Sequence, residues 1–337
     1  MFLDKLDMLI LEELSRNSRQ HLKDIAAKGG CSINTVSARL GRLERELKLR
    51  YTLELDFSKD GFPREFVVRA KFEGKPQLSG LRESFARLPG VQLAALTEGD
   101  FDLLLWCLAP SSEEYGFGLG QELRGVLGKS LADWSTYPVI DRHIGFLPVD
   151  SDLIDMLRLS EHRRRVLKIL NEGSRMMVTE LAEQLGVTEP TAEYHLKRIA
   201  PVVKRFTSYF ESPGEFVHIS RFVQLRGGAE ELRSEGRGLT ELYVRSDTRL
   251  FNRLVYAARI VGGWDVFMLE TFTSLEDYKE HNERVASFRK IVGKQESALI
   301  TKVLKGRIPI RKVDFAKEVA SLFNSYKPAL EEKVARL

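Results

Sequence analysis

The sequence is poor in the residues that build disulfide frameworks and metal sites. Its 337 residues include only two cysteines, Cys31 and Cys107, which lie far apart and form no CxxC spacing. We interpret both as small buried side chains in a protein of the reducing cytoplasm. The six histidines form no HxxxH or HExxH pair, so the sequence predicts neither a metal site nor a cofactor.

Long apolar runs are also absent. No stretch of about 18 apolar residues occurs, so we expect no membrane span. The opening segment, MFLDKLDMLILEELSRN, carries acidic residues within its apolar stretch and lacks a small-residue cleavage site. This pattern is typical of an amphipathic helix rather than a signal peptide. The chain length suits two to four domains.

The excess of positive over negative charge is small overall but concentrated in two segments. The net charge is only +4, which by itself is weak evidence for nucleic acid. Residues 1–50 hold 10 Lys and Arg against 7 Asp and Glu, and residues 160–210 hold 9 against 6. The positive excess therefore lies entirely in these two segments, which favours them as DNA-contacting regions.

These two segments repeat one pattern. SINTVSARLGRL (32–43) and TEPTAEYHLKRI (188–199) have matching apolar positions 156 residues apart, and the register extends back through two further predicted helices. Each copy predicts a helix, a short helix, a glycine-containing turn and a third helix that begins at Ser32 or Thr188. The pattern indicates a helix-turn-helix, and the segments that follow predict the strand and turn of a wing.

A second repeat follows each helix-turn-helix. TEGDFDLLLWCL (97–108) and VGGWDVFMLETF (261–272) each predict a strand, a tight turn and a strand, flanked by predicted strands and helices in the order βαββαβ. We therefore predict an α+β fold in which two winged helix-turn-helix domains alternate with two ferredoxin-like βαββαβ domains. The predicted segments are 1–62 (winged helix-turn-helix), 63–145 (βαββαβ), 146–159 (linker), 160–215 (second helix-turn-helix), 216–306 (second βαββαβ) and 307–337 (helical tail).

The order of parts resembles the leucine-responsive regulatory (Lrp/AsnC) transcription factors of bacteria and archaea. The resemblance is carried by LDKLDMLILEEL, by SINTVSARLGRLERELKLRYTLELDFSKDGF with its turn from Asp56 to Gly61, and by the GDFDLLL hairpin. It covers nearly all of residues 3–140 and, more loosely, 160–305. It implies binding of double-stranded DNA, a homo-oligomer formed through the sheet domains, and an amino acid or related small effector bound near the hairpins. Most members carry one copy, so this chain is either a built-in pseudo-dimer or pairs copy to copy with another chain.

The third helix of the first copy offers the better surface for reading DNA. Val36 and Leu43 define its buried side, and the opposite side is small, polar and basic, as a major-groove helix requires. In the second copy Glu189 and Glu193 would repel phosphate, and Pro201 predicts an earlier end to the helix. A solvated helix face is the alternative interpretation, and for the second copy the two interpretations are balanced. The candidate DNA-contacting residues are Ser32, Asn34, Thr35, Ser37, Ala38, Arg39, Arg42, Arg45, Thr188, Thr191, Tyr194, Lys197 and Arg198.

The hairpins of the two sheet domains match the effector region of the resembled family. A glycine-rich turn leaves backbone N–H groups open to a carboxylate. The alternative is a tight turn in which glycine supplies a positive φ. The candidate effector-binding residues are Gly99, Asp100, Asp102, Gly262, Gly263 and Asp265.

The leading hypothesis is a sequence-specific transcription regulator that is not an enzyme. One alternative is an enzyme resembling the sirohaem decarboxylases, which use the same paired domains on a tetrapyrrole. Such an enzyme would need His, Arg and Tyr converging on a sheet pocket, whereas the predicted strands are overwhelmingly apolar and only His143 and His218 lie near strand edges. A DNA-organising architectural protein is the other alternative.

Overall fold

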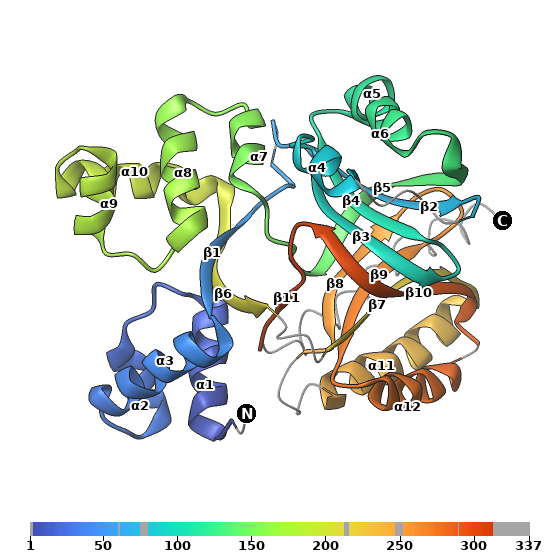
Figure 1. The fold of residues 1–337 in the computed structure, drawn as a ribbon. Helices are drawn as coiled ribbons and strands as arrows, with labels where there is room; N and C mark the ends of the chain where they lie inside the picture. The colour runs from blue at the N-terminus through green and yellow to red at the C-terminus, as the bar shows by residue number, and fades with distance from the viewer. Residues whose placement is uncertain are drawn as a thin grey trace. The chain divides into compact units, whose positions relative to one another are not determined.

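The computed structural model describes residues 3–59, 61–74, 80–211, 216–246, 252–288 and 290–312 (Figure 1). The chain divides into two compact units, and each unit draws on both halves of the sequence. The helix-turn-helix unit includes Met1–Arg64 and Pro148–Ser212, and the sheet unit includes Glu65–Leu147 and Pro213–Lys305. The predicted α+β class, with two helix-turn-helix and two βαββαβ segments, is confirmed. Of the predicted helical tail, residues 313–337 lie outside the described residues.

The first helix-turn-helix follows the local signals of the sequence. Asp4 caps its first helix, because the Asp4 carboxylate accepts hydrogen bonds from the backbone N–H groups of Leu6 and Asp7. Gly30 ends the second helix in the left-handed region, at φ 61°. Ser32 caps the third. The three helices are α1 (Lys5–Arg16), α2 (Leu22–Gly29) and α3 (Ile33–Leu47).

The second helix-turn-helix repeats this arrangement with two differences. Its third helix has 11 residues against the 15 of α3, because Pro201 stands in the 3-10 turn that follows it. The predicted linker 146–159 contains a helix, in which Leu153 and Ile154 are fully buried, so it packs onto the unit. The elements are α7 (Ser151–Met156), α8 (Glu161–Gly173), α9 (Val178–Leu185), α10 (Glu189–Ile199) and η3 (Ala200–Val202).

The strands after α3 and α10 differ from the predicted wings. β1 (Arg50–Leu55) pairs antiparallel with β6 (Val203–Glu211), and β11 (Pro309–Ile310) pairs with the other edge of β6. Each strand therefore finds its backbone partner in the other copy and not in a hairpin of its own. Buried Leu53 and Leu55 explain this choice, since a solvated wing would leave them exposed.

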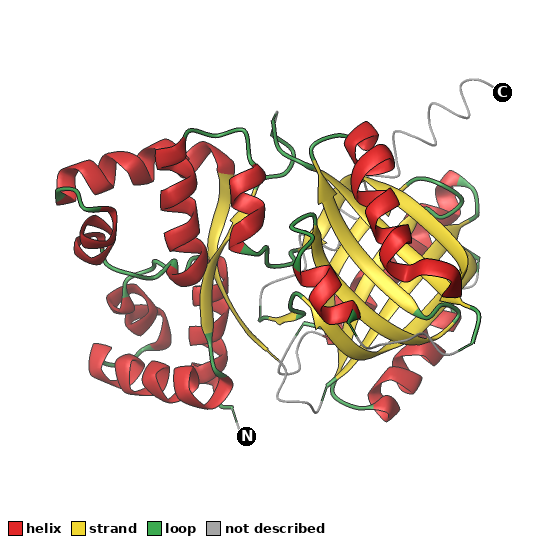
Figure 2. Ribbon diagram, turned by 45° about the horizontal axis from the view of Figure 1, so that its top comes forward, coloured by secondary structure: helices red, strands yellow, loops and turns green. Residues whose placement is uncertain are grey.

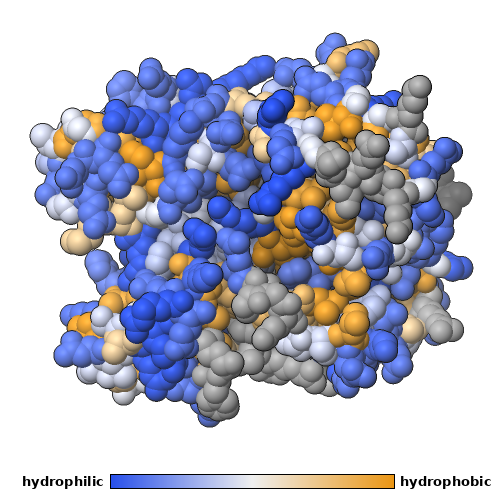
Figure 3. All heavy atoms as spheres, viewed as in Figure 1, coloured by the Kyte–Doolittle hydropathy of each residue, from blue (hydrophilic) through white to orange (hydrophobic). Residues whose placement is uncertain are grey.

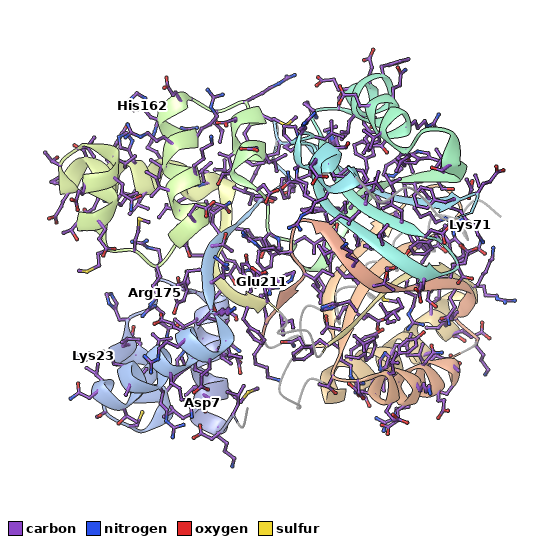
Figure 4. All side chains as sticks on the ribbon, viewed as in Figure 1. Asp7, Lys23, Lys71, His162, Arg175 and Glu211 are labelled. Carbon is purple, nitrogen blue, oxygen red and sulfur yellow. The ribbon has the colours of Figure 1, made fainter. Side chains whose placement is uncertain are left out.

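The two helix-turn-helix copies meet through reciprocal contacts. The Oγ atoms of Ser18 and Ser174, separated by the 156 positions of the repeat, lie 2.6 Å apart. Arg19 donates to the carbonyl of Ser174 at 2.8 Å, and Arg175, labelled in Figure 4, donates to the carbonyl of Ser18. Such self-complementary contacts are those of a two-fold dimer. The unit is thus a pseudo-dimer within one chain.

The sheet unit is a closed sheet of eight strands with helices on its outer surface (Figure 2). Its strand order, β10-β3-β4-β2-β5-β8-β9-β7, gives each copy the ferredoxin-like arrangement and joins the copies at the pairs β5–β8 and β10–β3. Closure leaves neither copy with an open edge. The first copy contains β2 (Arg64–Phe72), α4 (Leu81–Ala86), β3 (Val91–Gly99), β4 (Leu103–Ala109), α5 (Ser112–Glu114), η1 (Tyr115–Leu119), α6 (Gly120–Leu127), η2 (Gly128–Ser130) and β5 (Leu131–Gly145). The second contains β7 (Val217–Leu225), α11 (Ala229–Ser246), β8 (Leu254–Ile260), β9 (Val266–Phe272), α12 (Leu275–Ala286) and β10 (Val292–Lys305).

Two further expectations concern single residues and spans. Cys107 is buried as predicted, whereas Cys31 is partly exposed, and both are free thiols. Within the described ranges, no helix has the length and apolar character needed to cross a membrane.

Candidate functional site

The exposed side of α3 has the composition that a DNA-reading helix needs. Asn34, Ser37, Ala38 and Arg45 are all exposed, and the helix carries no acidic residue before Glu44. The space-filling view shows a largely hydrophilic surface over this region (Figure 3). Small residues allow a close approach of the helix to DNA, and Asn and Arg are common partners of adenine and guanine.

The two third helices begin with the same contact between two hydroxyl groups. The hydroxyls of Ser32 and Thr35 lie 2.9 Å apart, and those of Thr188 and Thr191 lie 2.9 Å apart. Ser32 also accepts a hydrogen bond from the backbone N–H of Thr35 at 3.1 Å. The capping bond accounts for Ser32 without contact with DNA, whereas the Thr188 side chain makes no capping bond to the backbone of α10.

Arg39 and Arg42, both candidate DNA contacts, are engaged within the domain. Arg42 Nη2 lies 2.5 Å from Oδ2 of Asp7, which is fully buried on α1 beside α3 (Figure 4). Arg39 Nη1 lies 2.6 Å from Asp4 Oδ2 and 3.3 Å from Asp7 Oδ1. Hydrogen bonds from the backbone N–H of Asp7 and from Arg39 lower the pKa of Asp4. We call Asp4, Asp7, Arg39 and Arg42 the carboxylate clamp. It holds α3 against α1, while about a third of each arginine side chain remains exposed.

The second third helix presents mixed charges. Tyr194, Lys197 and Arg198 are exposed on α10, and the Arg198 guanidinium lies 5.8 Å from the centre of the Tyr194 ring. Glu189 and Glu193 are exposed on the same helix. α10 therefore keeps the basic residues that the sequence singled out but surrounds them with carboxylates.

The hairpin aspartates of the two sheet domains share one structural role. Asp102 Oδ2 accepts from the backbone N–H of Phe72 at 2.8 Å, and Asp265 Oδ2 accepts from that of Leu225 at 2.7 Å. Each carboxylate thus ties the hairpin of its copy to the first strand of that copy.

The other hairpin candidates lie at turns and at a seam between the copies. Asp100 Oδ2 accepts from the backbone N–H of Ser297 at 2.7 Å, and a Cβ on Gly99 would lie 2.5 Å from the Ser297 carbonyl oxygen. Gly262 and Gly263 have φ values of 118° and 99°, which favour glycine. These contacts account for the residue types at the hairpins, and effector binding by them stays a prediction.

The sequence interpretation missed a buried cluster of charges between the sheet and the helices of the second βαββαβ copy. Arg221 on β7 donates through Nε to Glu270 Oε2 on β9 at 2.9 Å. The Tyr243 hydroxyl of α11 donates to Glu270 Oε1 at 2.7 Å, and Nε2 of His281 on α12 lies 3.4 Å from the same oxygen. All four side chains are at least 97% buried. We call these four residues the buried ionic cluster.

A second ion pair extends this cluster. Arg253 pairs with Asp277, and Arg253 Nη1 lies 3.0 Å from His281 Nδ1. Asp277 is also bound by the backbone N–H and the hydroxyl of Thr273, both at 3.1 Å. The network thus joins strands β7 and β9 to both helices that cover them.

The charges of the cluster stabilise one another. Burial alone would raise the pKa of Glu270, but Arg221 and His281 lower it far below its usual range. Burial opposes the charge of Arg221 as well, and Glu270 raises the pKa of its guanidinium. Burial and the neighbouring Glu270 raise the pKa of Tyr243, which stays a neutral donor. Among the described residues, no group of His, Cys, Asp and Glu is arranged to hold a metal ion.

A cavity adjoins the cluster. Its empty space, with the open mouth included, measures about 420 Å³, and its accessible wall is almost wholly apolar. Side chains such as Val223, Met268 and Val285 form that wall, and Arg221, Tyr243 and Gln295 border it. The cavity lies entirely within the second copy.

One signal in the sequence could have revealed the cluster. Arg221 and Glu270 stand inside the apolar strand segments HISRFVQL and VFMLETF. The hairpin contacts of the two copies align Phe72 with Leu225 and Asp102 with Asp265. In this alignment Arg221 matches Val68, and Glu270 matches Cys107. A charge in one copy where the other copy is apolar marks a buried position whose chemistry has changed.

Comparison with known proteins agrees with this architecture. A family model described as an AsnC-type helix-turn-helix domain matches residues 3–44, and another, described as a helix-turn-helix domain, matches residues 159–198. An uncharacterized HTH-type transcriptional regulator of Pyrococcus horikoshii is 31% identical over 129 residues, which cover 37% of this chain and 86% of that protein. The HTH-type transcriptional regulator LrpC of Bacillus subtilis is 37% identical over 71 residues, or 21% of this chain and 49% of LrpC.

One solved structure corresponds over nearly the whole length. The siroheme decarboxylase NirDL aligns over 97% of this chain and 100% of its own, with a TM-score of 0.57 and 13% sequence identity. At this identity the likeness establishes a shared fold. Fold and site define a helix-turn-helix protein in which two domain pairs are joined in one chain. The sequence matches show that the chain belongs to the Lrp/AsnC-type family of helix-turn-helix proteins.

Proposed function

We propose that the protein is a sequence-specific DNA-binding transcription regulator without catalytic activity, and that α3 is its principal reading helix. The observation that carries this proposal is the exposed side of α3, where Asn34, Ser37 and Ala38 lie on a stretch of helix without acidic residues. Arg45 is also exposed, nearer the end of the helix, between Glu44 and Glu46. The carboxylate clamp supports the proposal, because a helix held rigidly presents base-reading groups at a lower entropic cost. The regulator relatives support it by homology.

The pairing of the two helix-turn-helix copies supports a divided role for α3 and α10. In the proposed complex, α3 supplies most of the base contacts. Tyr194, Lys197 and Arg198 of α10 supply weaker phosphate contacts, because Glu189 and Glu193 repel the DNA backbone. Homo-oligomerisation belongs to the same proposal, and light scattering of the free chain measures it.

Selection of bound duplexes from a random pool tests the proposal. The full chain is compared with Asn34→Ala and Arg45→Ala on α3, and with Lys197→Ala and Arg198→Ala on α10. We expect the α3 variants to change the selected sequence and the α10 variants to weaken binding without changing it. Arg42→Ala is unsuitable as a test of base contact, since it removes a partner of buried Asp7. Failure to select any duplex at low salt overturns the proposal.

A second candidate is an enzyme acting on a tetrapyrrole, as NirDL does by its name. Two observations favour it: the whole-length correspondence of fold, and the presence of Arg221 and Tyr243 on the wall of one cavity, with His281 behind them beside Glu270. Titration of the purified chain with an iron porphyrin, followed by visible spectroscopy, separates the candidates. A saturable spectral shift that Arg221→Met abolishes supports the enzyme, and an unchanged spectrum supports the regulator.

A further inference from the structure

The guanidinium of Arg221 retains an unused donor deep inside the protein. Arg221 is 1% exposed, its Nε donates to Glu270, and its Nη1 donates to Asn282 at 3.0 Å and to Gln295 at 3.2 Å. Its Nη2 is buried and has no hydrogen-bond partner among the described residues. A buried donor without a partner costs about 1–3 kcal/mol, and the cost rises for a charged group.

Arg221 also borders the cavity of the second copy, so the residue that carries the unused donor adjoins the empty space. Apart from Arg221, Tyr243 and Gln295, the cavity wall is aliphatic, from side chains such as Val223 and Met268. An apolar wall with a few fixed polar groups is the usual form of a small-molecule site, in which the apolar surface supplies affinity and the polar group fixes orientation.

We propose that this cavity binds a small aliphatic carboxylate, with its carboxylate on Arg221 and its hydrocarbon chain against the apolar wall. The planar guanidinium is suited to a carboxylate, and Arg221 already holds Glu270 in this manner. The Glu270 pair fixes the orientation of the guanidinium before the ligand arrives. The site is distinct from the hairpins and does not depend on DNA binding.

The cavity disfavours an amino acid with its ammonium group. An ammonium needs acceptors, but Glu270 already accepts from Arg221 and Tyr243 and is not among the described residues that line the cavity. The Gln295 Oε1 likewise accepts from Arg221. A charged amine placed here would lose its hydration without compensation. The proposed ligand is therefore a simple or 2-oxo acid with a branched or straight aliphatic chain.

The first copy provides an internal control. At the position of Arg221 it has Val68, and at the position of Glu270 it has Cys107, both fully buried in a core that is almost entirely apolar. The same fold is therefore stable without the ionic cluster, and the charged residues of the second copy are not needed to close the sheet.

Isothermal titration calorimetry of the full chain without DNA tests the proposal. The probes are 4-methylpentanoate, its neutral amide 4-methylpentanamide, and L-leucine. We expect 4-methylpentanoate to bind with a Kd on the order of 1 mM or tighter. The amide and leucine should bind at least about tenfold more weakly, a difference of about 1.4 kcal/mol. Equal binding of acid and amide, or tighter binding of leucine, overturns the proposal.

Three variants locate the binding. The double variant Arg221→Met/Glu270→Gln removes the guanidinium without leaving a buried charge unpaired, and Val285→Phe fills the cavity while keeping the ion pair. Each should abolish binding of 4-methylpentanoate, and Cys107→Ala in the first copy should leave it unchanged. If the double variant fails to fold, Val285→Phe alone still tests whether 4-methylpentanoate binds in the cavity. Binding that survives in a folded Val285→Phe variant, or that Cys107→Ala reduces equally, overturns the proposal.

Discussion

The two βαββαβ copies share one backbone arrangement, but the side of the sheet that faces the helices is apolar in the first copy and carries buried charges in the second. In the first copy Val68, Cys107 and the backbone of Gly90 occupy positions that Arg221, Glu270 and Arg253 occupy in the second. A buried ion pair loses about as much hydration energy as it gains from attraction, so packing alone does not favour the charged version. The same fold therefore accepts either apolar or charged residues at these buried positions.

The helix-turn-helix copies differ in a similar way. The repeat places Arg163 where the first copy has Asp7, and His195 where it has Arg39. The carboxylate clamp is thereby replaced by a stack of His162 on His195, with ring centres 5.9 Å apart. Beside the apolar residues that both third helices bury, the first copy thus adds ion pairs and the second adds a ring contact.

The largest expected effect comes from breaking the buried ionic cluster. Glu270→Ala should lower the free energy of unfolding by about 3–5 kcal/mol, because Arg221 would remain buried without its counter-charge. The matched variant Cys107→Ala in the first copy should cost about 1 kcal/mol. Urea unfolding measures both, and equal losses would contradict the inferred difference between the copies.

A smaller effect on stability is expected from His218 on β7, a position that Glu65 occupies in the first copy. Burial lowers the pKa of His218 to about 4, below the value of about 6.5 in an unfolded chain. The unfolded chain therefore binds a proton between these pH values and the folded protein does not, so stability is complete above pH ~6.5 and falls toward pH ~4. The loss from this residue should reach about 3 kcal/mol. Thermal unfolding of His218→Gln across this range should show a correspondingly weaker pH dependence.

Third in size is the loss of the carboxylate clamp. Asp7→Ala leaves Arg39 and Arg42 without their buried partner and should cost about 2 kcal/mol, since both arginines are partly solvated. Arg163→Ala at the matching position of the second copy should cost less than about 0.5 kcal/mol. Chemical denaturation compares the two, and a larger loss for Arg163→Ala would reverse the contrast between the copies.

The smallest effects are expected on DNA affinity. Arg45→Ala should weaken binding to a selected site by about 1–2 kcal/mol, and Arg198→Ala by less than about 1 kcal/mol. Gel-shift titrations at one fixed salt concentration measure the difference. A greater loss for Arg198→Ala would make α10 the principal reading helix.

Much of the fold was predictable because it depends on local pattern. The apolar period, the glycine-containing turn, the start of the third helix at Ser32 and the helix-ending effect of Pro201 all act within a few residues and were confirmed. The pairing of β1 with β6 was not predictable, since a strand carries no local record of its partner. For the same reason the candidate arginines Arg39 and Arg42 could not be seen to face Asp7.

The two repeats, their helix and strand content and the family to which the chain belongs follow from the amino-acid order alone, because these depend on periodicity and short motifs. The folded chain was needed to show that the two helix-turn-helix copies form one unit and that the two sheets close on each other. It also decided that Arg221, Glu270, Tyr243 and His281 meet in one buried cluster. These residues lie on four separate elements, and burial and contact between distant elements are properties of the packed chain.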